Sequence, residues 1–155
     1  MKLRSLFAAF LLIAFIFSGC DENENEPQPI TQPAPEPGMT ATLDGKPWKA
    51  VNPKATTKNQ FIVAGASPDE ISINLFHGGI TEPGTYHVTA MIMEPVPSTA
   101  SAIAWGHPNA EITVTKYDIV EKKVSGTFSF IASPNPGATG TRVVTDGIFT
   151  DIPVQ

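Results

Sequence analysis

The sequence contains one cysteine, Cys20, among its 155 residues. A single cysteine can form no disulfide within the chain and excludes a zinc site built from several cysteines. Basic residues are also scarce, since ten lysines and arginines stand against fifteen acidic residues, for a net charge of -5. This balance offers no cationic surface for phosphates and argues against nucleic acid as a partner. The length suits one modest globular domain.

Catalytic and cofactor motifs are missing as well. The sequence has no G-x-S-x-G, no H-E-x-x-H, no glycine-rich nucleotide loop and no EF-hand. His77 and His87 could face each other on neighbouring strands, with Glu82 or Glu94 completing a metal set. A structural role is favoured instead, because His77 precedes two glycines at a strand end and His107 lies in a W-G-H-P loop. We therefore expect no metal, no cofactor and no enzymatic activity.

What the sequence does contain begins with an export signal. Lys2 and Arg4 form a positive start, and residues 6–17 form an uninterrupted apolar run before the small residues Ser18 and Gly19. A helix of this length spans about 18 Å at about 1.5 Å per residue, too short for a hydrocarbon core of about 30 Å. The segment is predicted to be a signal peptide rather than a permanent membrane anchor.

The tetrapeptide F-S-G-C at residues 17–20 resembles the lipobox of bacterial lipoproteins, although Phe17 replaces the usual aliphatic residue. The resemblance implies that residues 1–19 are removed and that Cys20 is acylated, which makes a membrane the partner of this end of the chain. Several acyl chains anchor a protein stably, whereas a single chain is marginal. The alternative is an ordinary secretory signal followed by a free thiol.

Residues 20–38 form an acidic, proline-rich segment that lacks basic residues and is predicted to be an extended stalk. The acidic residues directly after the cysteine resemble the surface-export signal of lipoproteins from Bacteroidetes: Asp21, Glu22, Glu24 and Glu26. In the enterobacterial pattern, by contrast, an aspartate at this position implies retention at the inner membrane. The expectation is an outer-membrane lipoprotein that is exposed at the cell surface.

From residue 39 to 155 the pattern is that of half-buried strands, in which apolar and polar residues alternate. The alternation is clear at 71–75, 86–92, 111–115 and 124–132. Asp44-Gly45 is a two-residue hairpin signal, because both positions of a type I′ turn need a positive φ. No stretch shows a capped helical stripe. The predicted domain is all-β, an antiparallel β-sandwich or closed barrel of about eight or nine short strands.

The core of this domain is expected to include large apolar side chains at inward positions: Trp48, Ile73, Val114, Phe128 and Phe130. Residues 93–110 interrupt the alternation with several prolines. There we expect a loop followed by a short strand at residues 103–105.

Several segments of the domain together resemble a family of uncharacterised lipoproteins from Bacteroidetes. They are M-T-A-T-L-D-G-K-P-W-K-A at 39–50, G-T-Y at 84–86, I-T-V-T-K-Y-D at 112–118, V-S-G-T-F-S-F at 124–130 and V-V-T-D-G-I-F-T-D-I-P-V at 143–154. The resemblance implies an all-β domain and a place in the cell envelope. It brings no activity, cofactor or catalytic residue.

The leading functional hypothesis is a non-enzymatic envelope lipoprotein whose domain binds or scaffolds a glycan, a protein or a small molecule. Candidate ligand-binding residues are Trp48, Tyr86 and Trp105, whose rings could form an aromatic platform. The alternative is a carrier of a small hydrophobic ligand, with a barrel cavity lined by Phe61, Ile73, Phe128 and Phe130. A hydrolase is the third class. It would need paired carboxyl groups about 5 to 9 Å apart, and no spacing selects such a pair.

Overall fold

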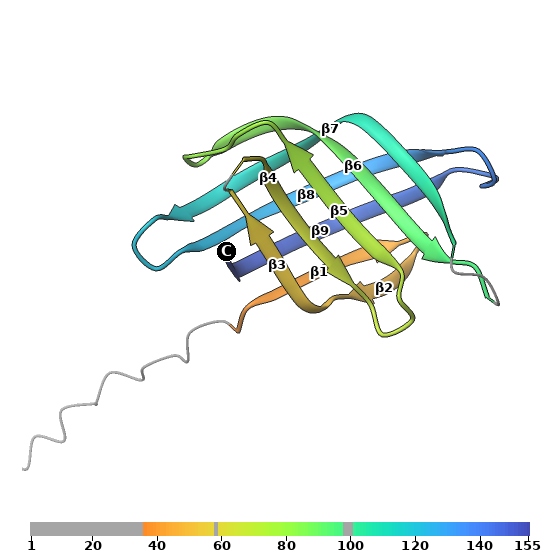
Figure 1. The fold of residues 1–155 in the computed structure, drawn as a ribbon, viewed down its shortest axis with the longest axis horizontal. Coiled ribbons are helices and arrows are strands. Elements are labelled where there is room, and N and C mark those ends of the chain that lie inside the picture. Colours follow the sequence, from red (N-terminus) through yellow and green to blue (C-terminus); the bar gives the residue numbers. More distant parts are fainter. Residues whose placement is uncertain (1–35, 58, 98–100) are drawn as a thin grey trace, which may run out of the picture. The chain divides into compact units, whose positions relative to one another are not determined.

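The computed structural model describes residues 36–57, 59–97 and 101–155, and these form nine antiparallel strands without a helix (Figure 1). The strands are β1 (Gly38–Leu43), β2 (Lys46–Lys49), β3 (Val51–Thr56), β4 (Phe61–Ala66), β5 (Ser72–His77), β6 (Gly84–Pro95), β7 (Ala102–Asp118), β8 (Lys123–Pro134) and β9 (Arg142–Pro153). The predicted all-β class and strand number are confirmed. The signal segment, Cys20 and most of the predicted stalk lie outside the described residues.

The nine strands form one sheet that curls into a nearly closed barrel, in the order β2-β1-β9-β8-β7-β6-β5-β4-β3. Its two outer strands, β2 and β3, are consecutive pieces of the chain on either side of Ala50. Because β2 pairs with β1 and β3 pairs with β4, the chain itself joins the two edges. The Ala50 N–H donates to Met39 O at 2.9 Å, and Ala55 bridges Val154. Between the two predicted architectures, the structure is therefore barrel-like.

Several strands are longer than the sequence pattern suggested. β7 runs for 17 residues, where only a short strand at 103–105 was expected. The loop expected before it does separate β6, which ends at Pro95, from β7, which begins at Ala102. The strand continues through Pro108 because this residue lies in a part of β7 where the pairing with both neighbours is irregular. The register of β7 with β8 shifts between Gly106 and Glu111. A bulge of this kind tolerates a residue that has no N–H to donate.

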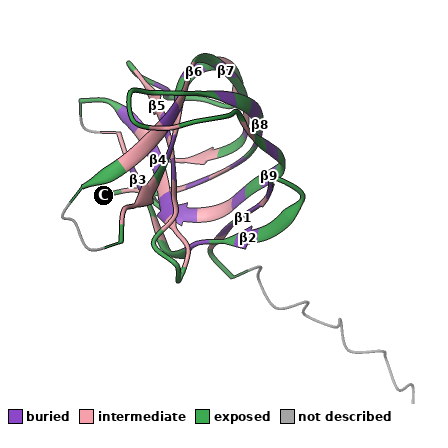
Figure 2. Ribbon diagram, turned by 90° about the vertical axis from the view of Figure 1, so that its right-hand side faces the viewer, coloured by how far each residue is buried: buried purple, intermediate pink, exposed green. Residues whose placement is uncertain are grey.

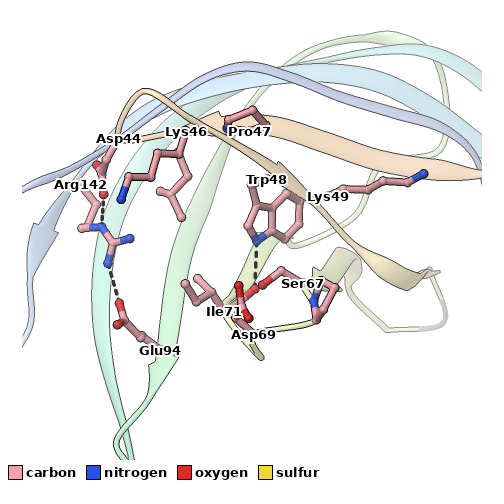
Figure 3. Close-up of a pocket in the computed structure, with 12 residues that line it drawn as sticks. Asp44, Lys46, Pro47, Trp48, Lys49, Ser67, Asp69, Ile71, Glu94 and Arg142 are labelled. Atoms are coloured by element: carbon pink, nitrogen blue, oxygen red, sulfur yellow. Dashed lines mark hydrogen bonds and ion pairs between the residues drawn. The ribbon is translucent and has the colours of Figure 1, made fainter.

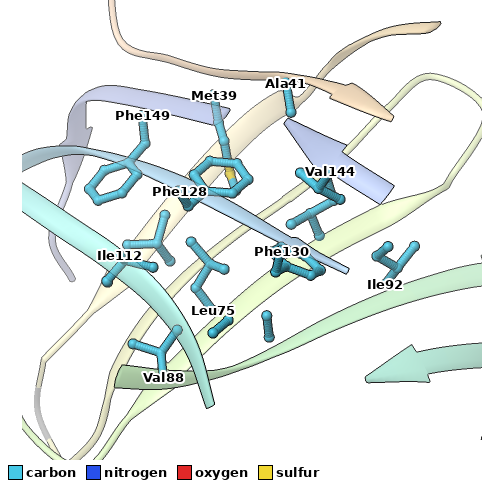
Figure 4. Packing of buried hydrophobic residues seen from close by; sticks show 14 of the residues in the cluster. Met39, Ala41, Leu75, Val88, Ile92, Ile112, Phe128, Phe130, Val144 and Phe149 are labelled. Atoms are coloured by element: carbon cyan, nitrogen blue, oxygen red, sulfur yellow. The ribbon is translucent and has the colours of Figure 1, made fainter. Parts of the chain in front are cut away.

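Buried positions alternate with more exposed ones along the strands (Figure 2), and the apolar side chains at the buried positions pack together inside the barrel (Figure 4). In β8, every second residue from Val124 to Ala132 is buried, as predicted. The five residues expected in the core are all buried: Trp48, Ile73, Val114, Phe128 and Phe130. None of the buried residues in the described part of the chain is polar or charged.

Two glycine–phenylalanine pairs connect β8 and β9 at the centre of this core. Gly126 pairs with Phe149, and Phe128 pairs with Gly147. A Cβ at Gly147 would lie 2.5 Å from both a ring carbon and the carbonyl oxygen of Phe128, so no other residue fits without movement. The rings of Phe128 and Phe149 stack with centroids 6.4 Å apart. The repeated G-x-F pattern thus fixes the register of the two strands.

The antiparallel register gives the barrel two distinct ends. At the entry end the chain enters β1, and Gly38 pairs with Thr150 of β9. The turn between β7 and β8 lies at the same end, because Lys123 pairs with Pro153. The opposite end, called the Arg142 end after the first residue of β9, holds the turns between β1 and β2 and between β4 and β5.

Candidate functional site

A cleft of about 580 Å³ opens at the Arg142 end, between the β1–β2 hairpin and the β4–β5 turn (Figure 3). Its lining combines apolar and charged side chains: Leu43, Asp44, Lys46, Pro47, Trp48, Lys49, Ser67, Pro68, Asp69, Ile71, Glu94 and Arg142. A concave site with a few convergent polar groups is the usual form of a ligand site.

The β1–β2 turn forms one wall of the cleft. Asp44 and Gly45 have φ values of 50° and 75°, which confirms the hairpin that the sequence predicts. The turn is also tied to β9: the Asp44 N–H donates to Val143 O at 2.8 Å, and the Val143 N–H donates to Asp44 Oδ1 at 2.8 Å. These bonds direct the remaining carboxylate oxygen of Asp44 toward Arg142.

Arg142 connects three parts of the barrel mouth. Its Nε pairs with Asp44 Oδ2, and its Nη1 pairs with Glu94 Oε2 at 2.7 Å. The guanidinium also lies over the Trp105 ring, 4.8 Å from the ring centroid. Burial alone would lower the pKa of Arg142, but the hydrogen bonds with Glu94 and Asp44 outweigh it and raise the pKa above its usual value. Since β9 and β6 are not neighbours in the sheet, the Glu94 pair spans the mouth.

The two tryptophans of the chain are both fixed at this end. The Trp48 Nε1–H donates to Ile71 O at 3.0 Å and thereby links β2 to the segment before β5. The Trp105 Nε1–H donates to Gly140 O at 3.1 Å in the β8–β9 loop. Their exposed fractions are only 5% and 4%. Both rings therefore pack mainly against protein, and Trp48 contributes an edge to the cleft.

The three predicted aromatic residues do not form one platform. Trp48 lines the cleft and Trp105 lies beneath Arg142, whereas Tyr86 is near the opposite end of β6 from Glu94. There its ring meets His77 edge to face at 5.5 Å, and its hydroxyl donates to Glu82 O at 2.9 Å. A ligand-binding role for any of the three stays a prediction.

No sequence pattern predicted the ion pairs of the cleft. Arg142 lies 98 residues from Asp44 and 48 residues from Glu94 along the chain, so no local spacing connects them. Of the cleft, local sequence signals indicated only the Asp-Gly turn and the aromatic residue Trp48. Lys46, Lys49 and Asp69 complete the charged lining, which makes three cationic and three anionic side chains. The cleft therefore carries balanced charge.

The residues of the predicted carrier cavity and the histidines considered as metal ligands lie outside the cleft. The four residues proposed to line a carrier cavity, Phe61, Ile73, Phe128 and Phe130, belong to one packed core cluster. His77 Nδ1 accepts the Gly79 N–H at 3.0 Å, and among the described residues no three His, Cys, Asp or Glu side chains gather as a metal set. The described residues also contain no helix with the length and apolar character needed to cross a membrane.

The described residues thus form a nine-stranded, barrel-like sheet with a cleft of mixed polarity at one end. Residues 35–153 match the model of a family described as a domain of unknown function, DUF6252. The chain belongs to this family. No curated protein and no solved structure matches it.

Proposed function

We propose that the chain is a lipid-anchored lipoprotein of the cell envelope whose β domain is a non-enzymatic binding module, with its ligand site in the cleft at the Arg142 end. The signal segment and the F-S-G-C motif support lipidation at Cys20. The acidic stalk supports a position on the outer face of the outer membrane. The concave shape and mixed polar and apolar lining of the cleft support a ligand site there.

The observation that carries the choice of ligand is the charge balance of the cleft. Lys46, Lys49 and Arg142 line the same cleft as Asp44, Asp69 and Glu94, so the lining as a whole has no net charge that would favour an ion of one sign. A neutral molecule that both donates and accepts hydrogen bonds fits better, and apolar side chains in the lining can cover its carbon face. An oligosaccharide has these properties.

The arrangement of the carboxylates supports binding rather than hydrolysis. Asp44 and Glu94 both point at the Arg142 guanidinium (Figure 3). Two carboxylates that share one cation do not flank a substrate bond as an acid–base pair must. Removing either one would leave a less compensated charge beside Trp105. Their role in the proposal is to hold Arg142 and the cleft wall in place.

Intrinsic fluorescence can test the ligand site, because both tryptophans lie at this end of the domain. Neutral oligosaccharides titrated into the protein should change the tryptophan emission in a saturable way. Lys46→Ala combined with Asp69→Ala should weaken that binding at least tenfold, whereas His87→Ala on the exposed side of β6 should not. Equal binding by all three proteins would overturn the assignment of the cleft.

Lipidation has its own test. Replacing Cys20 with Ser should release the protein from membranes and abolish incorporation of a labelled fatty acid. Incorporation that continues in this variant would contradict the anchor.

Surface display is tested at the stalk. Replacing Asp21, Glu22, Glu24 and Glu26 with Ala should reduce protease accessibility on intact cells without changing the thermal midpoint of the domain. Unchanged accessibility would refute the sorting role.

A further inference from the structure

Two neighbouring apolar residues are exposed at the tip of the β7–β8 hairpin. Ile119 and Val120 are 76% and 87% exposed, the highest values among the large apolar side chains that the structure describes. Turn tips are ordinarily polar. An exposed apolar pair at the tip of a hairpin therefore indicates a partner that buries it.

The tip is already ordered for such a contact. Asp118 Oδ1 accepts the N–H of Val120 at 3.0 Å and the N–H of Glu121 at 2.8 Å, which holds both apolar residues outward. The Glu121 bond is the main reason that the pKa of Asp118 is below its usual value. The Val120 bond and two nearby lysines lower this pKa further, whereas burial opposes them. A preformed tip loses little conformational entropy on docking.

The charges around the tip neutralise one another. Lys116 pairs with Asp151 at 3.1 Å, and Lys123 pairs with Glu121 at 3.1 Å. No excess charge of one sign is left to select an acidic or basic protein surface. The long lysine stems can extend toward headgroups while the apolar pair goes deeper.

The position of the tip supplies the argument for its partner. The β7–β8 turn lies at the entry end, on the same side of the barrel as Gly38, where the chain from Cys20 joins the domain (Figure 1). An acyl anchor at Cys20 would hold this end at a high effective concentration near the lipid. Weak burial of two aliphatic side chains then suffices for docking.

We propose that Ile119 and Val120 insert into the headgroup and acyl boundary of the membrane that holds the lipid on Cys20. This inference rests on the proposed anchor. It orients the domain with the entry end at the lipid and the Arg142 cleft away from it.

The test uses the full lipidated protein in vesicles of phosphatidylethanolamine and phosphatidylglycerol. Val120→Cys is labelled with an environment-sensitive fluorophore, which is selective because Cys20, the only native cysteine, is acylated in the mature protein. The matched control is Asp69→Cys, an exposed turn residue at the Arg142 end. We expect spin-labelled lipid to quench the Val120 label at least twofold more than the Asp69 label.

The outcomes separate the two proposals. Protein that does not stay on the vesicles overturns both the anchor and the docking. Protein that stays bound but shows equal quenching at the two positions overturns docking alone. A Val120 label that is already shielded without lipid, and becomes exposed on dilution, would show a second copy of the chain as the partner and would also overturn membrane docking.

Discussion

The cleft at one end of the barrel and the apolar tip of the β7–β8 turn at the other are stabilised by different kinds of contact. At the Arg142 end, side chains join segments 48 and 98 residues apart, across the mouth from β9 to β6 and to the β1–β2 turn. At the entry end, the β7–β8 tip is held by Asp118 bonds to residues two and three positions further along. The first arrangement exists only when the whole sheet has formed, whereas the second can form within one hairpin.

This difference suits the two proposed roles. A ligand cleft needs walls from several strands in fixed positions, and Arg142 provides a common connection among them. A tip that enters lipid needs only its own ordered turn and exposed apolar side chains. The core between the ends should support both.

The largest effect is expected from Phe128→Ala, which removes a ring stacked between Phe130 and Phe149. The lost burial and the resulting cavity should destabilise the domain by about 3 to 5 kcal/mol. Denaturant unfolding measures this value, and Thr127→Ala on the exposed side of β8 is the control. If the variant loses less than about 1 kcal/mol of its free energy of unfolding, the ring is not buried in a packed core as described.

An intermediate effect is expected from Arg142→Met at the Arg142 end. The variant loses both ion pairs and the contact with Trp105, and solvent screening at the half-exposed carboxylates limits the cost to about 1 to 2 kcal/mol. Tryptophan emission should shift to the red as the mouth opens. The matched change at the entry end, Lys116→Met, should alter neither quantity, and equal effects from the two variants would break the comparison.

A smaller loss is expected from Trp48→Phe, which keeps an aromatic ring but removes the N–H that donates to Ile71 O. The lost bond should cost about 1 kcal/mol. Amide exchange in the β4–β5 turn should become faster while exchange in the β7–β8 turn stays the same. If both turns respond alike, Trp48 acts on the whole fold and not on the cleft wall.

The smallest effect concerns the pH dependence of the entry end. The bond from the Glu121 N–H is the main cause of the lowered pKa of Asp118. A lowered pKa in the folded state means that the stabilisation is complete above the unfolded value of about 3.9 and is lost as the pH falls through the folded value.

Amide chemical shifts of Val120 and Glu121 should therefore titrate together with the Asp118 carboxyl group, below the usual range. Asp118→Ala should abolish this titration and lower the global unfolding midpoint less than any of the three variants above. A titration of the two amides at the ordinary aspartate pKa would contradict the hydrogen bonds at the tip.

Local patterns in the sequence predicted what depends on neighbours in the chain. The alternation at 124–132 indicated which face of β8 is buried, and Asp44-Gly45 indicated a hairpin, because strand pleating and turn geometry need only a few adjacent residues. The extent of β7 was missed, since the bulge around Pro108 depends on how two partner strands pair.

The candidate site was predicted only in part for the same reason. Trp48 and Trp105 attracted attention as aromatic residues, but Arg142, Asp44 and Glu94 meet only through the closure of the barrel. Their chain separations leave no spacing to recognise. A cleft made from distant strand ends therefore required the structure.

Hydrogen–deuterium exchange of the full lipidated protein, compared in vesicles and in detergent, tests the two-ended account most directly. The account predicts that vesicles slow exchange in the β7–β8 turn around residues 118–123, while the turns around residues 44–46 and 67–71 at the Arg142 end exchange equally in both conditions. Slower exchange in vesicles at the Arg142 end, with no change at residues 118–123, would contradict it.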